Sequence, residues 1–184
     1  MDWQYYKECL EKAGVKFDVG LSDFEIEKVE AKYEFNFPPD LKEFLQFALP
    51  VGKGWVDWRN GNEREIKSRF DWSYEGICFD IEHSKFWLEK WGEQPSKLED
   101  AFEVAKTEIA KAPKLIPILS HRFIPDRPNK SGNPIFSVYQ TDIIIYGINL
   151  HIYLQNEFSD YFDEKQTAEN IEERKIEFWS NLAG

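Results

Sequence analysis

The chain has 184 residues, of which 16% are aromatic and 31% are charged, and its 23 basic and 34 acidic residues give a net charge of −11. So many aromatic side chains exclude a disordered chain, and the length predicts one domain, 1–184, with a substantial hydrophobic core. The negative charge argues against nucleic acid or anionic lipid as a partner, because both would be repelled, and favours a basic protein.

The N-terminal residues and the two cysteines predict a cytoplasmic protein that needs no cofactor. Residues 1–8 lack the basic start and apolar run of a signal peptide, and no stretch is long enough to span a bilayer. Cys9 and Cys78 are far apart in the sequence, so neither a disulfide framework nor a zinc site is expected.

The first third of the chain predicts three helices. The periodicity of residues 3–13 indicates a helix that Gly14 closes. Ser22-Asp23-Phe24-Glu25 is a capping box, and the helix that it starts must stop before Pro38-Pro39. A third helix is expected over residues 40–48, where apolar side chains recur at helical spacing.

A glycine-bracketed loop follows at residues 52–61 and carries Trp55, Asp57, Trp58 and Arg59. Tryptophan beside charged side chains is typical of interface hot spots, and loops are where binding residues concentrate. The alternative is that both tryptophans seal the edge of the core, which is the commoner position for this residue in so aromatic a chain. These four residues are the first candidates for partner binding.

The middle of the chain predicts a short helix over residues 63–70 and then a strand over residues 76–82. On this strand Asp80 and Glu82 would share one face, and both are further candidates for partner binding. Helical spacing is expected for Phe86, Trp87 and Trp91, and a longer helix for residues 96–111.

The last part of the chain predicts a sheet followed by helices. Strands are expected over residues 115–125 and 134–146, and the second contains the run Ile143-Ile144-Ile145, which is typical of a central strand. Asn149 is expected to cap a helix. A final amphipathic helix would carry Ile171, Phe178, Trp179 and Leu182. Helices, a mainly antiparallel sheet and further helices predict an α+β fold.

Catalysis and metal binding receive little support from the sequence. Asp80, Glu82 and His83 are possible metal ligands, but on a strand His83 would point away from the other two. His121 is expected to be half-buried and held by Asp126 or Asp142, and a role as general base would need a nucleophile that no motif supplies. We therefore expect neither an enzyme nor a metal site.

Two runs of the sequence resemble the opening signature of the SUKH superfamily, which includes fungal Smi/Knr-type cell-wall synthesis regulators and many bacterial proteins. The runs are Leu21-Ser22-x-x-Glu25-Ile26-x-x-x-Glu30 and Phe37-Pro38-x-Asp40-Leu41-x-x-Phe44-Leu45. Further segments are similar to a bacterial branch: Trp55-x-x-Trp58-Arg59, Gly76-Ile77-x-Phe79-Asp80-Ile81-Glu82, Ser120-His121-Arg122-Phe123 and Gly132-Asn133-Pro134. The resemblance covers residues 21–158. Where family members have Asn-Gly after the third helix, this chain has Pro50-Val51-Gly52.

The resemblance implies a compact α+β domain without family-wide catalytic residues and, in bacteria, a frequent role as an immunity protein that neutralises a toxin domain. We therefore expect a monomeric or homodimeric protein that occludes a basic toxin domain, such as a nuclease, through an acidic surface with Trp55 and Trp58 as anchors. Two alternatives remain open: a regulatory scaffold with several weak partners, and a metal-assisted hydrolase that uses Asp80, Glu82, His83 or His121.

Overall fold

The computed structural model describes residues 2–163 and 174–183 of the chain. Its α-helices are α1 (Trp3–Lys12), α2 (Asp23–Tyr33), α3 (Pro39–Phe47), α4 (Glu63–His83), α5 (Leu98–Ile109), α6 (Leu150–Glu157) and α7 (Trp179–Leu182). The strands are β1 (Lys16–Val19), β2 (Ala48–Val51), β3 (Leu115–Leu119), β4 (Arg122–Pro125), β5 (Ile135–Tyr139) and β6 (Asp142–Gly147). Two short 3₁₀ helices span Glu89–Trp91 and Ser159–Tyr161.

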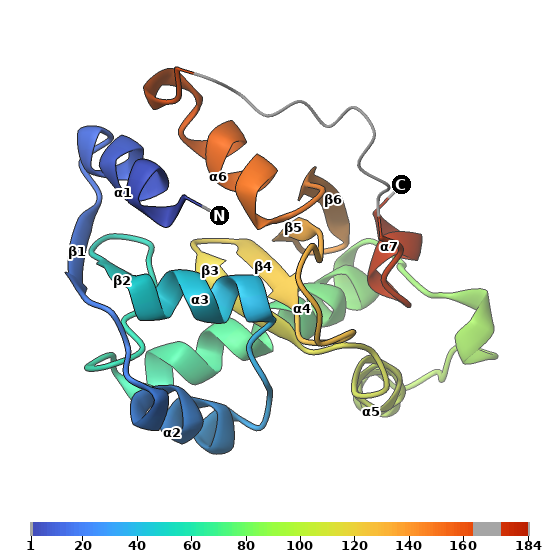
Figure 1. The fold of residues 1–184 in the computed structure, drawn as a ribbon. Helices are drawn as coiled ribbons and strands as arrows, with labels where there is room; N and C mark the ends of the chain where they lie inside the picture. Colours follow the sequence, from blue (N-terminus) through green and yellow to red (C-terminus); the bar gives the residue numbers. More distant parts are fainter. Residues whose placement is uncertain (1, 164–173, 184) are drawn as a thin grey trace.

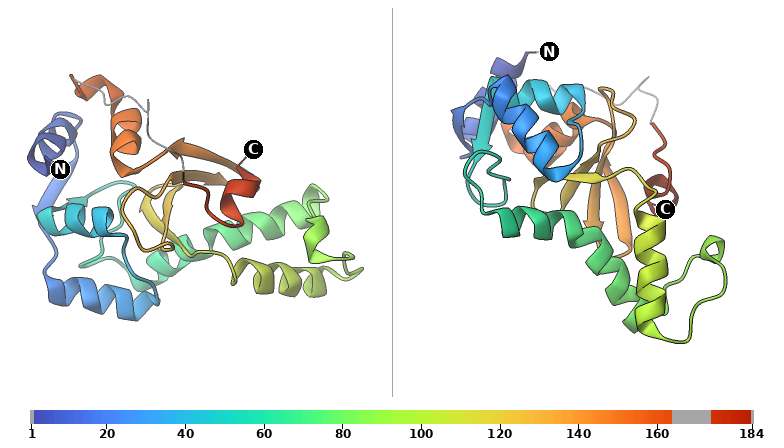
Figure 2. Two further views of the ribbon diagram at one scale, coloured as in Figure 1. Left: turned by 45° about the vertical axis from the view of Figure 1, so that its right-hand side comes forward. Right: turned by 90° about the horizontal axis from the view of Figure 1, so that it is seen from below.

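The fold is α+β, as predicted, with one antiparallel sheet in the order β3-β4-β5-β6 and a second formed by β1 and β2 (Figure 1). Helix α6 lies on one side of the larger sheet, and α4 and α5 lie side by side on the other (Figure 2). Apolar side chains alternate between the two faces of the strands, so the sheet separates two hydrophobic clusters. The first cluster lies against α1, α2, α3 and α6, and the second against α4, α5 and α7.

The predicted helix caps at Ser22 and at Asn149 are confirmed in atomic detail. The hydroxyl of Ser22 accepts a hydrogen bond from the backbone N–H of Glu25 at 3.3 Å, and the Glu25 carboxylate accepts one from the backbone N–H of Ser22 at 2.8 Å. This reciprocal pair satisfies two N–H groups that a helix start leaves unbonded. Helix α3 begins at Pro39, whose missing N–H costs nothing in the first turn. The Asn149 side chain caps α6 by accepting from the N–H of Ile152.

The predicted strand over residues 76–82 is wrong, because these residues belong to α4. The buried side chains Ile66, Ser73, Ile77, Asp80 and Ile81 recur at helical spacing along one face of this helix. The predicted helix over 63–70 is thus the first third of α4. Residues 86–88 are not helical, and α5 begins two residues after the predicted start at 96.

The two long predicted strands are β-hairpins. Residues 115–125 contain β3 and β4, and residues 134–146 contain β5 and β6. Two-residue turns join the strands of each hairpin, at Ser120-His121 and at Gln140-Thr141. The first residue of each turn has a positive φ, 50° for Ser120 and 57° for Gln140, as tight hairpin turns require.

Strand β6 is at the edge of the four-stranded sheet within the described residues, not at its centre as predicted. Ile143 is buried against the second cluster, whereas Ile144 points to the other face and is 48% exposed. The apolar run is therefore only half buried, and Ile143 makes an isolated parallel bridge with Ala183. Strands β1 and β2 are absent from the sequence prediction, since each has only four residues and pairs across the whole of α2 and α3.

The C-terminal helix is shorter than predicted. Phe178 and Trp179 are buried at the start of α7, and Leu182 is its last residue. The predicted position of Ile171 lies outside the described residues. None of the described helices combines the length and apolarity that crossing a bilayer requires.

Candidate functional site

The two tryptophans of the loop 52–61 are buried, contrary to the expectation that they form exposed anchors. Trp55 is 8% exposed and Trp58 is 7% exposed. The ring of Trp58 packs against Phe35 and Phe37, with centroids 5.9 and 5.3 Å away, and the ring of Trp55 stacks on Phe158 at 6.3 Å. Both indoles thus belong to the first hydrophobic cluster. They lie in the core, as the alternative interpretation of this loop predicted.

The charged residues of the same loop bond to the protein itself. The Asp57 carboxylate accepts hydrogen bonds from the backbone N–H groups of Arg59 and Asn60 at 3.1 and 2.8 Å. Arg59 forms an ion pair with Glu25 and donates to the carbonyl of Gly20 at 3.0 Å. Hydrogen bonds from Arg59 and Ser22 lower the pKa of Glu25 to about 2. This loop therefore closes over the start of α2 and stabilises the fold.

Asp80 and Glu82 point to different sides of the molecule, because they lie on a helix and not on a strand. Asp80 is buried, and its Oδ2 accepts from the backbone N–H of Thr141 at 2.9 Å and from its hydroxyl at 2.6 Å. Glu82 is exposed, with a carboxylate oxygen 3.9 Å from Nδ1 of His83. In the described parts of the chain, no three His, Cys, Asp or Glu side chains are grouped so that they could hold a metal ion.

His121 is half-buried, as expected, but neither predicted carboxylate holds it. Asp126 accepts from the backbone N–H of Lys114 at 2.8 Å, and Asp142 is exposed at the start of β6. Burial first, and the nearby Arg122 second, lower the pKa of the His121 imidazole, so it is neutral at physiological pH. Arg122 forms an ion pair with Glu157 at 3.0 Å.

The outward side of α4 carries exposed aromatic and acidic side chains in adjacent rows. Trp72 and Phe79 are 40% and 47% exposed and, two turns apart, lie on the same side of the helix. Tyr139, at the end of β5, is 60% exposed. The exposed acidic residues of this side are Asp71, Glu75 and Glu82. We call these six side chains the α4 face.

Three contacts fix the β5–β6 turn on α4, and they come from residues four apart on the helix. The indole N–H of Trp72 donates to the carbonyl of Val138 at 2.9 Å. Gly76 lies against Gln140 so closely that a Cβ on Gly76 would be 2.7 Å from the Gln140 Cα. Asp80 accepts the two bonds from Thr141. Tyr139 is thereby held at a fixed position beside Trp72. This packing of the β5–β6 turn on α4 was not predicted from the sequence, although residues 72, 76 and 80 have the spacing of one helix face.

A pocket of about 340 Å³ opens beside the α4 face. We call it the Arg69 pocket; its lining residues are Arg69, Trp72, Ser120, His121, Phe123 and Tyr139. Arg69 Nη1 donates to the carbonyl of Gly54 at 2.8 Å, and the backbone N–H of Ser120 donates to the same oxygen at 2.8 Å. Gly54 thus places the guanidinium against the β3–β4 turn.

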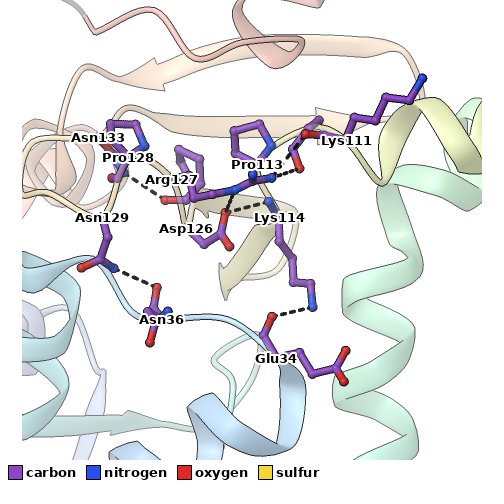
Figure 3. A network of polar contacts seen from close by, with 12 residues as sticks. Glu34, Asn36, Lys111, Pro113, Lys114, Asp126, Arg127, Pro128, Asn129 and Asn133 are labelled. Carbon is purple, nitrogen blue, oxygen red and sulfur yellow. Dashed lines mark hydrogen bonds and ion pairs between the residues drawn. The ribbon is translucent and has the colours of Figure 1, made fainter.

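The polar residues of the loop 126–133, together with Lys114, have a structural role (Figure 3). Lys114 Nζ donates to the carbonyl of Glu34 at 2.9 Å, and Arg127 Nη2 donates to that of Ala112 at 2.6 Å. The side-chain amide of Asn129 donates to the carbonyl of Phe37 at 3.0 Å. The first bond joins the residue before β3 to the end of α2, and the other two join the β4–β5 loop to the segment after α5 and to the segment before α3, so they hold chain segments together.

Comparison of the chain with family models, curated proteins and solved structures finds no match in any of the three. The function is therefore inferred from the resemblance described above and from the geometry of the α4 face and the Arg69 pocket.

Proposed function

We propose that the chain is an immunity-type binding protein, as the SUKH resemblance implies, and that it neutralises a basic toxin domain by binding it through the α4 face. The observation that carries the proposal is the row of exposed aromatic side chains next to exposed carboxylates on α4. Trp72, Phe79 and Tyr139 are each at least 40% exposed. Aromatic side chains in such a position are typical binding hot spots.

The carboxylates of the α4 face favour a basic partner. Among the residues that the structure describes, Asp71 and Glu75 make no ion pair, so their charges act outward. The chain as a whole has a net charge of −11. A field of this sign accelerates the encounter with a basic protein, and a nuclease domain is basic where it binds phosphates.

The aromatic side chains would supply most of the affinity. An arginine or lysine of the partner can lie on the indole of Trp72 or the ring of Phe79, a contact that contributes about 0.5–2 kcal/mol. The bond from Trp72 to Val138 holds the indole in place before binding. Little side-chain entropy is then lost on association, which raises the affinity.

Neutralisation on this surface needs no chemical step. Helix α4 has 21 residues, which gives it a length of about 30 Å. A partner that docks along this helix has its own basic surface covered over much of that length. A toxin whose active site lies in the basic surface loses access to its substrate.

The aromatic side chains can be tested on the isolated complex. The tagged chain is used to capture the partner from its native cell, and the purified pair is then studied by isothermal titration calorimetry and by the partner's nuclease activity. Trp72→Ala and Phe79→Ala should each weaken binding at least about tenfold and restore nuclease activity at equal concentrations. Phe24→Ala is the matched control, because Phe24 is 72% exposed on α2, outside the α4 face.

The carboxylates are tested by the association rate. Glu75→Gln should slow association and reduce its salt dependence, whereas Glu27→Gln, at an exposed position on α2, should have the smaller effect.

Equal effects of Trp72→Ala and Phe24→Ala would contradict the assignment of the α4 face. Capture of several weak partners in place of one dominant basic protein would favour a regulatory scaffold.

A further inference from the structure

We propose that the Arg69 pocket binds the carboxylate of a small apolar acid, either a free molecule or the C-terminal residue of a polypeptide. The pocket shares Trp72 and Tyr139 with the α4 face, but its ligand does not depend on the immunity function. Three features of the pocket carry the proposal: a cation that makes no ion pair in the described part of the chain, a lining that includes aromatic side chains, and a single positive charge.

The cation is the guanidinium of Arg69. It has one bond, to the carbonyl of Gly54, and in the described part of the chain no carboxylate forms an ion pair with it. Burial lowers the pKa of the Arg69 guanidinium, and the negative charge of Glu65, four residues earlier on α4, acts in the opposite direction. A guanidinium has five N–H donors in a fork that fits the two oxygens of a carboxylate, so such a ligand would compensate this partly buried charge.

The lining of the pocket favours a ligand that has an apolar side chain. The exposed aromatic side chains of Trp72 and Tyr139 line a volume of about 340 Å³, and Phe123, which is only 1% exposed, also lines it. Pockets for small molecules begin at about 300 Å³ and combine such walls with a few polar groups that fix orientation. Here the polar groups are Arg69, Ser120 and His121, all at the β3–β4 turn side of the cavity. The volume suits a side chain of the size of phenylalanine or leucine.

The charge of the pocket favours a monoanion over a phosphate. Arg69 is the one cation that lines the pocket in the described residues, because the His121 imidazole is neutral at physiological pH. A phosphate dianion would bring one charge more than Arg69 compensates, into a protein whose net charge is −11. A carboxylate matches the single guanidinium in charge and in geometry.

The test is a titration of the full chain, without any partner, with two ligands that differ only in charge. N-acetyl-phenylalanine has a free carboxylate, and N-acetyl-phenylalaninamide does not. Followed by NMR chemical shifts of the Trp72 indole N–H, the acid should bind at least about tenfold more tightly than the amide. Peptides that end in phenylalanine, with a free or an amidated C-terminus, separate the two sources of the carboxylate. Tighter binding of the free-acid peptide than of N-acetyl-phenylalanine assigns the site to a polypeptide C-terminus.

Variants of Arg69 give the second part of the test. Arg69→Gln should reduce the affinity for the acid to that of the amide, while Arg64→Gln, exposed on the same helix, should leave it unchanged. Equal affinities of the acid and the amide, or no binding of either, would overturn the proposal, and so would full binding by Arg69→Gln. If Arg69→Gln does not fold, the comparison of acid and amide on the unaltered chain decides. Partner capture is a separate measurement, so either proposal can fail alone.

Discussion

The loop 52–61 and the α4 face contain the same kinds of residue and differ in what those residues contact. In the loop, Trp58 packs against the rings of Phe35 and Phe37, and Arg59 pairs with Glu25. On the α4 face, the ring of Trp72 is 40% exposed and the neighbouring carboxylates point to solvent. The loop uses its aromatic and charged groups to stabilise the fold, whereas the α4 face leaves them available to a partner. Residue type alone does not separate a core tryptophan from an interface tryptophan.

Truncation of one tryptophan in each region, Trp58 in the loop and Trp72 on the α4 face, should give the largest difference in the free energy of unfolding. Trp58→Ala removes a buried indole from the first cluster and should lower the free energy of unfolding by about 3–5 kcal/mol. Trp72→Ala removes a partly exposed indole and one hydrogen bond, so a loss of about 1–2 kcal/mol is expected. Chemical denaturation of both variants measures the two values. A larger loss for Trp72→Ala would mean that the α4 face is primarily structural.

Acidification should destabilise the first hydrophobic cluster, to which both loop tryptophans belong, through the buried His151. His151 is 8% exposed and packs against the rings of Trp3 and Tyr6 in the first cluster, and its Nε2 is buried without a partner among the described residues. Burial lowers its pKa to about 4 from the ordinary value of 6.5. Between these values the unfolded chain binds a proton that the native chain does not, so stability is lost as the pH falls from 6.5 to 4. The loss should reach about 3 kcal/mol.

A histidine variant isolates this effect from the titration of carboxylates. Denaturation of His151→Gln between pH 7 and pH 4 should show a smaller loss of stability than the unaltered chain. An unaltered pH dependence in His151→Gln would show that the buried imidazole does not cause it.

The smallest effect is expected at the junction of α4 with the β5–β6 turn. In Gly76→Ala the new Cβ would approach the Gln140 Cα to 2.7 Å, and a backbone atom cannot rotate away. Overpacking costs about 1–3 kcal/mol, and the better helix propensity of alanine returns up to about 1 kcal/mol. A net loss of about 1–2 kcal/mol is therefore expected in chemical denaturation. Ser68→Ala, exposed on the same helix, is the control; a gain of stability in Gly76→Ala would contradict the close contact.

Local signals in the sequence were sufficient for several elements. The capping box at Ser22 and Glu25 and the cap at Asn149 act within a few residues, and the structure confirms both. The α+β class also followed from the order of the elements.

Features that depend on distant contacts were not predictable from the same signals. Residues 76–82 alternate in polarity like a strand, and only the longer spacing from Ile66 to Ile81 reveals the helix. The burial of Trp58 depends on Phe35 and Phe37, whose approach no local pattern encodes. The α4 face could not be predicted for the same reason, because Tyr139 lies beside Trp72 only in the folded chain.

The three contacts between α4 and the β5–β6 turn make the α4 face a discontinuous epitope. Its helical part ends at His83, and Tyr139 comes from a hairpin more than fifty residues later. A synthetic peptide with the sequence of α4 would lack the tyrosine and, removed from the sheet, would form little helix in water. Such a peptide should compete poorly for the partner, so an effective mimic would have to include the β5–β6 hairpin as well.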